Sequence, residues 1–213
     1  MSDSQLSTPE PNPEAQSATA PVRKRPKPGE RRVQILQALA TMLEQPGAER
    51  ITTAALAARL EVSEAALYRH FASKAQMFEG LIEFIEQSVF TLVNQITERE
   101  VAGAAQAAKV VTMLLQFAEK NPGMTRVMVG DALVFENDRL QQRMNQFFDK
   151  IEATLKQSLR SGADGDAATP SADAQVRASM LTSFAVGRLQ RFARSGFRRM
   201  PSEHLEASLA HML

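Results

Sequence analysis

Residues 51–74 of the chain read ITTAALAARLEVSEAALYRHFASK, and this stretch decides the fold. It predicts a short alanine-rich helix that begins at Thr52 or Thr53, a three-residue turn at 61–63, and a second short helix that ends near His70. The small side chains of the first helix let the two helices approach closely. The pattern is typical of the two-helix corner that docks in the major groove of DNA. On the pattern alone, an ordinary helical hairpin that does not bind DNA is about as good an interpretation.

The outer face of the second helix in this corner carries the candidate DNA contacts. Hydroxyl groups and a methyl group there can meet base edges and phosphates, which predicts contacts from Ser63, Glu64, Ala65, Tyr68 and Arg69. Thr52 and Thr53 lie at the positive end of the preceding helix, which favours phosphate binding. Lys74 begins the next helix and adds a further predicted phosphate contact.

Outward from this corner, apolar residues recur at helical spacing through most of the chain. A helix is predicted from Glu30 until Pro46 and Gly47 end it, and Ser73 with Gln76 forms a capping box that opens a long helix at 74–97. Further helices are predicted at 104–121, 124–129, 137–160 and 171–195, with a surface loop at 161–170 and a last short helix that starts at Pro201. No strand-like alternation persists, so the fold class is all-α.

The composition of the chain argues against several classes of function. The 213 residues include no Cys, which excludes disulfides and thiolate chemistry, and the three His residues have no neighbours at ligand spacing. There is no Gly-rich phosphate loop and no distinguishable catalytic carboxylate pair. We therefore expect no enzyme, no catalytic residue, no metal site and no cofactor. No apolar run is long enough to span a membrane and no secretory signal is visible, so we expect a cytoplasmic protein.

Charge and proline content divide the chain into parts. Residues 1–28 hold six of the ten prolines and few apolar residues, which predicts a disordered tail with a basic end. The basic residues around 22–32 are interpreted either as an arm along nucleic acid or as a solubilising tail. Residues 20–74 carry a net charge of +5 and residues 75–187 a net charge of −4. We expect a DNA-binding domain at 29–74 and a helical dimerisation and partner-binding domain at 75–213.

The run at 51–74 resembles the signature of the TetR family of dimeric DNA-binding regulators. The resemblance implies a TetR-like fold, with an N-terminal three-helix DNA-binding domain and a C-terminal helical dimerisation domain. It also implies DNA-contacting positions, namely Thr52, Ser63, Ala65, Tyr68, His70 and Lys74. Family members typically have Gly where Glu61 stands, so we expect mild backbone strain in a left-handed conformation there.

The resemblance continues beyond the DNA-binding module, through SEAALYRHF, MF-x-x-LIEFIE (77–86), E-x-NPG-x-TR (119–126) and 132–147. These segments are similar to the nucleoid occlusion branch of the TetR family. This similarity implies a nucleoid-associated homodimer that binds double-stranded palindromic DNA sites and antagonises the division protein FtsZ. It also implies that the FtsZ tail binds a groove formed by Phe84, Met113, Lys120 and Asn121.

The residues themselves also suggest partner surfaces. Phe84 and Phe90 lie off the apolar stripe of the helix at 74–97, so they are candidate partner anchors unless another helix of the chain covers them. The helix at 171–195 is apolar almost all round and has small residues at four-residue spacing, which predicts a four-helix dimer interface with the helix at 137–160. Its candidate contacts are Met180, Phe184, Gly187 and Phe192. The alternative is a monomer that buries this surface internally.

A second function stays open beside the division inhibitor. Most TetR-family members are repressors that leave DNA when a small ligand binds. An apolar pocket for such a ligand is conceivable at Met113, Phe117, Met128 and Phe135, although residues at this spacing more often form a plain core. We therefore regard a small-molecule ligand as the less favoured expectation.

Overall fold

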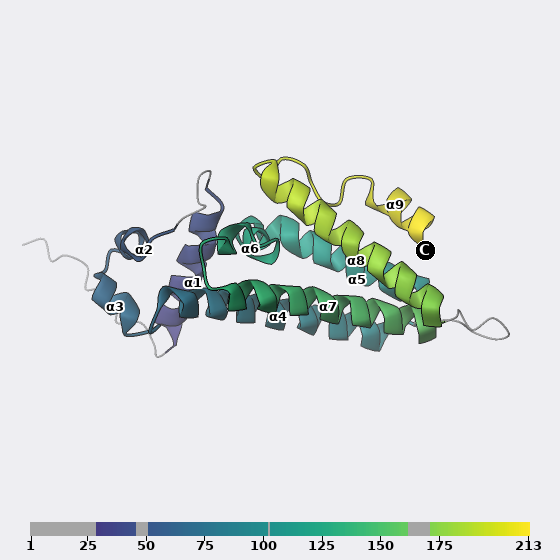
Figure 1. The fold of residues 1–213 in the computed structure, drawn as a ribbon, viewed down its shortest axis with the longest axis horizontal. Helices are drawn as coiled ribbons and strands as arrows, with labels where there is room; N and C mark the ends of the chain where they lie inside the picture. Colours follow the sequence, from purple (N-terminus) through teal and green to yellow (C-terminus); the bar gives the residue numbers. More distant parts are fainter. Residues whose placement is uncertain (1–28, 46–50, 102, 162–170) are drawn as a thin grey trace, which may run out of the picture.

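The computed structural model describes residues 29–45, 51–101, 103–161 and 171–213, and every regular element within them is a helix (Figure 1). The predicted all-α fold class is therefore confirmed. The tail predicted at 1–28, the helix end predicted at Pro46 and Gly47, and most of the loop predicted at 161–170 lie outside the described residues.

Three helices form the N-terminal module, and the second and third start directly after predicted capping residues. They are α1 (Glu30–Leu43), α2 (Thr53–Arg59) and α3 (Glu64–Tyr68). The Oγ1 atom of Thr52 accepts a hydrogen bond from the backbone N–H of Ala55 at 3.1 Å, and the Oγ atom of Ser63 accepts one from Ala66 at 3.3 Å. Each cap satisfies a backbone donor that the helix leaves unpaired and contributes about 1 kcal/mol.

The turn between α2 and α3 has the left-handed residue that the sequence predicts. Glu61 has φ 54°, and its N–H donates to the carbonyl of Ala58 at 3.1 Å while the N–H of Val62 donates to Ala57 at 3.0 Å. This pair of hydrogen bonds closes the end of α2 as a Schellman motif. A side chain in this conformation costs about 1 kcal/mol relative to glycine, so the strain at Glu61 is confirmed.

The remaining helices form a layered body. They are α4 (Lys74–Arg99), α5 (Ala104–Lys120), α6 (Pro122–Met128), a single 3₁₀ turn η1 (Asp131–Leu133), α7 (Asp138–Ser161), α8 (Ser171–Arg194) and α9 (Leu205–Met212). In Figure 1, α4 and α7 lie along one side, α5 and α8 lie above them, and α2 and α3 form the opposite end from the C-terminus. One continuous hydrophobic core runs from Ile35 of α1 to Leu209 of α9.

The last helix begins later than predicted. Pro201 does not start it, because residues between α8 and α9 form turns in which Gly196, Phe197 and His204 all have positive φ. The segment is fixed instead by hydrogen bonds, including one at 2.7 Å from the N–H of Ser202 to Oε1 of Glu119 on α5. The helix then runs from Leu205 to Met212.

Helices α4 and α7 run in the same direction, and three ion pairs, which we call the ion ladder, join α4 to α7 or to the segment directly before it. Its rungs are Lys74–Glu136, Glu79–Arg139 and Glu86–Arg143. In the third rung, Nη2 and Nε of the arginine donate to the two carboxylate oxygens of the glutamate at 2.6 and 3.2 Å. This hydrogen bonding raises the pKa of Arg143 above its ordinary value.

A glycine contact joins the N-terminal module to the body. Gly123 at the start of α6 packs against the backbone of α1, where a Cβ atom would lie 1.9 Å from the carbonyl oxygen of Ala40. Only glycine fits this contact without moving one helix. The position of the N-terminal module relative to the body therefore depends on close packing between α1 and α6.

Candidate nucleic-acid interface and partner groove

The short helix α3 presents the predicted DNA-contacting face to solvent. Leu67 is buried and holds α3 against the core, while the opposite side of the helix is exposed. That exposed side carries Ser63, Glu64, Ala65, Tyr68 and Arg69, and the Tyr68 ring is 44% exposed. The structure thus places all five residues on one accessible surface, as the helical spacing predicts.

A polar network on this face links α2 and α3. The hydroxyl of Thr53 donates to Oε2 of Glu64 at 2.6 Å, and the hydroxyl of Tyr68 lies 3.5 Å from Oγ1 of Thr53. The network holds the two hydroxyl groups in fixed positions at the surface. It also places a carboxylate among the candidate contacts, and an ionised carboxylate accepts hydrogen bonds from the amino group of cytosine while repelling phosphate.

Thr52 and Ser63 have a double role. Each side-chain oxygen already accepts the capping hydrogen bond of its helix, but each hydroxyl hydrogen is still available for donation. Both residues are exposed. The same groups that begin the helices can therefore donate to phosphate oxygens at the positive ends of those helices.

An arginine of α1 contacts the chain directly after α3. The guanidinium of Arg32 donates to the backbone carbonyl of His70 and lies 4.1 Å from the centroid of the Phe71 ring. This contact fixes the end of α3, and His70 itself is only half exposed. The sequence places Arg32 in the basic stretch interpreted as an arm or a solubilising tail, because a partner 38 residues further along the chain leaves no local signal.

Lys74, the predicted phosphate contact at the start of α4, has a partner inside the protein. Its Nζ atom lies 2.5 Å from Oε1 of Glu136, and the two side chains are 27% and 10% exposed. Glu136 lies in the segment between η1 and α7, 62 positions along the chain. The structure therefore ties one predicted DNA contact to the first rung of the ion ladder.

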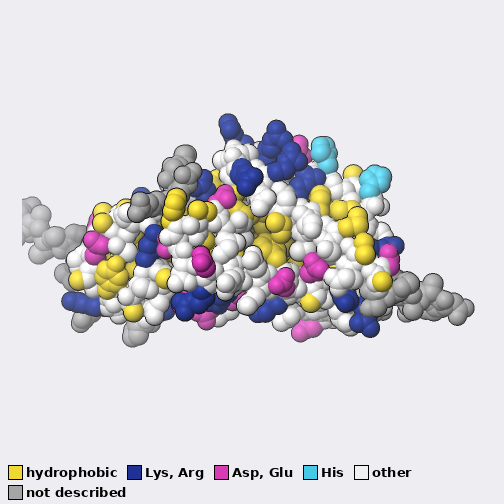
Figure 2. Space-filling view, viewed as in Figure 1, with side chains coloured by type: hydrophobic (Ala, Val, Ile, Leu, Met, Phe, Trp, Pro, Cys, Tyr) yellow, Lys and Arg dark blue, Asp and Glu magenta, His cyan; other side chains and the backbone are white. Residues whose placement is uncertain are grey.

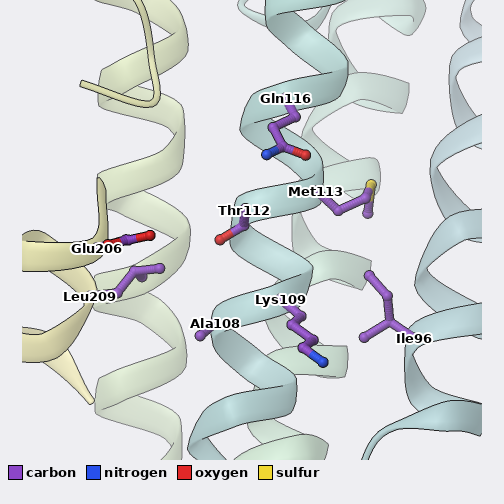
Figure 3. Close-up of a pocket in the computed structure, with 8 residues that line it drawn as sticks. All are labelled: Ile96, Ala108, Lys109, Thr112, Met113, Gln116, Glu206 and Leu209. Atoms are coloured by element: carbon purple, nitrogen blue, oxygen red, sulfur yellow. The ribbon is translucent and has the colours of Figure 1, made fainter. Parts of the chain in front are cut away.

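A surface groove lies where α4, α5 and α9 meet. It has a volume of about 500 Å³, and Figure 3 shows Ile96 on one side, α5 residues in the centre, and Glu206 with Leu209 on the other side. Met113 of α5, which the resemblance implies to be a partner-binding residue, lines this groove. The contribution of α9 was missed, because that helix was expected at a different place and carries no motif.

The other predicted partner-binding residues lie along the same two helices, outside this groove. Phe84 lies on α4, while Lys120 is the last residue of α5 and Asn121 follows it; α5 packs against α4. Lys120 is exposed, and the side chain of Asn121 donates to the carbonyl of Phe117 at 2.8 Å.

The two aromatic residues on the polar side of α4 have different environments. Phe84 is 48% exposed, which leaves a large apolar side chain in contact with solvent. Phe90 is covered by α7, where its ring packs edge-on against Phe147 with a centroid distance of 5.5 Å. Phe84 thus keeps its candidate role as a partner anchor, whereas Phe90 belongs to the intramolecular packing.

The predicted dimer residues of α8 separate into three groups. Met180 is 51% exposed, and Gly187 has open space where a Cβ atom would be. Phe184 is half-buried beneath the guanidinium of Arg188, at 4.9 Å. Phe192 is 2% exposed and packs edge-on against Phe197, so the structure does not bring it to the surface that the others share. Val176, at 57% exposure, joins that surface instead.

Basic side chains also gather near the end of α8. Figure 2 shows Lys and Arg side chains along the upper edge of this face, above a hollow in which hydrophobic side chains lie. Arg191, Arg194 and Arg198 are all exposed, as expected for a solvated face. Among the described residues, no group of three metal-ligating side chains is present, and no helix is long and apolar enough to cross a membrane.

The residues suggested for a ligand pocket have different environments. Met128 is 2% exposed within the core, whereas Phe135 is 69% exposed at the surface. Of the four, only Met113 lines the groove between α4, α5 and α9. The suggested residues are thus divided between this groove, the core and the surface.

Comparison with known families agrees with this geometry. A model of the bacterial regulatory proteins of the tetR family matches residues 35–81, and a model of the SlmA-like, tetracyclin repressor-like C-terminal domain matches residues 104–213. The chain belongs to the TetR family of DNA-binding regulators, which makes it a regulator and not an enzyme.

Within that family, the sequence is similar to the nucleoid occlusion factor SlmA. The SlmA of Idiomarina loihiensis is 52% identical over 177 residues, which cover 83% of this chain and 90% of that protein. The SlmA of Alteromonas mediterranea is 50% identical over 180 residues, which cover 84% and 92% respectively. The resemblance drawn from the sequence motifs is confirmed.

Solved structures share the fold at low sequence identity. The fatty acid degradation regulator FadR from Bacillus halodurans superposes with a TM-score of 0.70 and 14% identity, over 88% of this chain and 96% of that one. A TetR-like regulator from Rhodococcus sp. RHA1 gives 0.69 and 19%, over 88% and 97%. These matches confirm the TetR-like fold.

Proposed function

We propose that this protein is a nucleoid occlusion factor, which binds palindromic chromosomal sites as a homodimer and antagonises FtsZ assembly over the nucleoid. The observation that carries the proposal is the 52% identity to a SlmA over nine tenths of that protein's length. The accessible face of α3 and the exposed Phe84 support the two binding activities that this function needs. The protein would then be found on the nucleoid, in the cytoplasm.

Recognition of DNA would use α3 in the major groove. The Tyr68 ring, the Ala65 methyl group and the Ser63 hydroxyl lie on its exposed face and reach base edges and phosphates, while Thr52 and Thr53 meet the backbone. Arg69 and the half-exposed His70 would contact phosphates at the end of α3. Two such modules in a symmetric dimer read two half-sites about 34 Å apart, which explains the expected palindrome.

The dimer would form through α7 and α8. The exposed side chains of Val176 and Met180, the exposed Ser183 and the open position at Gly187 follow one stripe of α8. Small residues in such a stripe permit close approach of a second copy, and a two-fold axis lets the same stripe meet itself. The four-helix arrangement predicted from the sequence needs this surface.

The FtsZ tail would bind along α4 and α5. Phe84 and Asn121 lie at one end of this surface, and the groove with Met113 lies towards the other. Lys120 provides an exposed cation beside Asn121. A short tail must become ordered when it binds, so we expect a dissociation constant in the micromolar range, about −8 kcal/mol.

Sedimentation of GTP-assembled FtsZ tests this function. We expect the purified protein to reduce the sedimented polymer only when a duplex with its selected palindrome is present. Phe84→Ala should abolish the reduction while DNA affinity stays unchanged, because Phe84 is remote from α3. Glu83→Ala, an exposed change at the neighbouring position of α4, is the matched control and should behave as the unaltered protein.

Polymer that sediments unchanged in every condition, with DNA binding intact, would contradict the division inhibitor. That result would favour the ligand-responsive repressor. The number of chromosomal sites gives an independent check, since division control requires many sites and a simple repressor requires few.

A further inference from the structure

The ion pair between Lys74 and Glu136 is unusual in its place and in its burial. Lys74 is the first residue of α4, directly after the DNA-binding module, and Glu136 precedes α7 in the body. The carboxylate side chain is only 10% exposed, and a buried carboxylate is stable only when it is paired. The pair therefore connects the module that meets DNA with the helix that we assign to the dimer.

The pair holds the ammonium group against the body of the protein. The Nζ atom of Lys74 lies 2.5 Å from Oε1 of Glu136, in the segment before α7, and 5.7 Å from the centroid of the Phe78 ring on α4. To reach a phosphate in front of α4, the side chain must leave this position.

We propose that Glu136 is an internal competitor of DNA for Lys74, so that the two occupy the ammonium group alternately. In the free protein the carboxylate holds the ammonium, and in the complex a backbone phosphate replaces it. Both anions offer oxygen acceptors to the same compact cation. The inference rests on the proposed function, because it requires Lys74 to contact DNA.

Release of Glu136 has a structural consequence for the segment before α7. Val134 and Phe135, at 70% and 69% exposure, have little burial of their own to hold them. The other two rungs of the ion ladder still join α4 to α7. DNA binding would therefore free the segment at 134–136 while α4 and α7 keep their relative position. Breaking the ion pair between Lys74 and Glu136 costs free energy, and this cost lowers the affinity for every DNA sequence equally, because phosphates carry no sequence information.

A double-mutant cycle on DNA affinity tests the competition. The proteins are the unaltered chain, Glu136→Gln, Lys74→Met and the double variant, titrated against a labelled duplex with the selected palindrome and against a random duplex of the same length. We expect Glu136→Gln to tighten binding to both duplexes about fivefold, equivalent to about 1 kcal/mol. In the Lys74→Met background the same change should have no effect.

The outcomes separate this inference from the proposed function. If Lys74→Met leaves affinity and its salt dependence unchanged, the phosphate contact predicted for Lys74 is absent and the competition is wrong, while DNA binding through α3 is unaffected. If Lys74→Met weakens binding but Glu136→Gln does not tighten it, the competition alone is wrong. Asp138→Asn removes an exposed carboxylate two residues away and is the control for a general charge effect. Tightening by Asp138→Asn as large as that by Glu136→Gln would also overturn the inference.

A spectroscopic measurement detects the release itself. The chain has no cysteine, so Val134→Cys gives a single thiol for an environment-sensitive dye next to Glu136. We expect its emission to change when the selected duplex is added. The labelled Lys74→Met protein, whose Glu136 has lost its partner, should show that changed emission without DNA. An emission spectrum that is identical in all of these samples would show that the segment stays in place and would contradict the proposal.

Discussion

Hydroxyl groups at the starts of α2 and α3 cap their helices and also face the predicted DNA surface. Because capping fixes these side chains, the atoms predicted to contact DNA have little conformational freedom. Thr52 and Ser63 begin their helices and still have a hydrogen to donate. Thr53 donates its hydroxyl hydrogen to Glu64 and lies next to the hydroxyl of Tyr68. Side chains that are already fixed in this way lose little entropy when DNA binds, which favours affinity and a defined register.

Tyr68 is the residue at which this arrangement is best tested. Tyr68→Ala removes a 44%-exposed ring from the centre of the recognition face, so we expect loss of specific DNA binding with an intact dimer. Tyr68→Phe, the matched variant, loses only the hydroxyl and should keep part of the affinity. Fluorescence anisotropy of a labelled palindrome measures both. Unchanged affinity of the alanine variant would contradict the docking of α3 in the major groove.

At the level of elements, the packing of α6 against α1 fixes how the DNA-binding module meets the body. The contact leaves no space beyond the glycine hydrogen, because a Cβ atom at position 123 would overlap the carbonyl oxygen of Ala40 at 1.9 Å. Backbone atoms cannot rotate away as side chains do. The two helices must therefore separate if Gly123 is replaced.

We expect Gly123→Ala to lower the free energy of unfolding by about 1–3 kcal/mol, a typical cost of overpacking. It should also weaken DNA binding, since α1 shifts with the module. Gly80→Ala is the control, because its Cβ would lie 3.2 Å from an atom of the Phe71 ring and 3.3 Å from a methyl group of Leu36, which are side-chain atoms. Thermal unfolding compares the two, and an equal loss of stability would contradict the steric explanation.

The observed helix starts show which features of the helices can be predicted from local sequence. The caps at Thr52, Ser63 and Ser73 were found because a capping residue and its partner lie within three positions of each other. The start of the last helix was wrong, because Pro201 permits a helix but the turns around it follow from a distant hydrogen bond to Glu119. Local signals fix local structure, and contacts between distant segments override them.

The candidate sites follow the same rule at the scale of the whole molecule. The exposed face of α3 was predictable, since a periodic pattern separates Leu67 from its polar neighbours. The partner of Lys74 was not, because Glu136 comes to it only through packing of the complete chain. The burial of Phe192 was not either, because the chain turns back after α8 and places Phe197 against it. The same holds for the wall that α9 adds to the groove.

The symmetric dimer that we propose depends on the exposed stripe of α8. Met180→Lys places a charge on that stripe, and burial of an unpaired ammonium opposes association. We expect mostly monomer by sedimentation equilibrium, together with a large loss of affinity for the palindrome, because one module reads only one half-site. Val134→Lys changes an equally exposed apolar residue away from α8 and should remain dimeric. A dimeric Met180→Lys protein would contradict this interface.

Tyr68 is the only tyrosine in the chain, and there is no tryptophan. All tyrosine emission of this protein therefore comes from one ring, which lies on the surface assigned to the DNA. A base or phosphate that approaches the ring changes its emission directly, without an attached dye. The unmodified protein thus carries its own optical reporter of DNA occupancy, and the same absence of other chromophores makes its ultraviolet absorbance unusually weak for its mass.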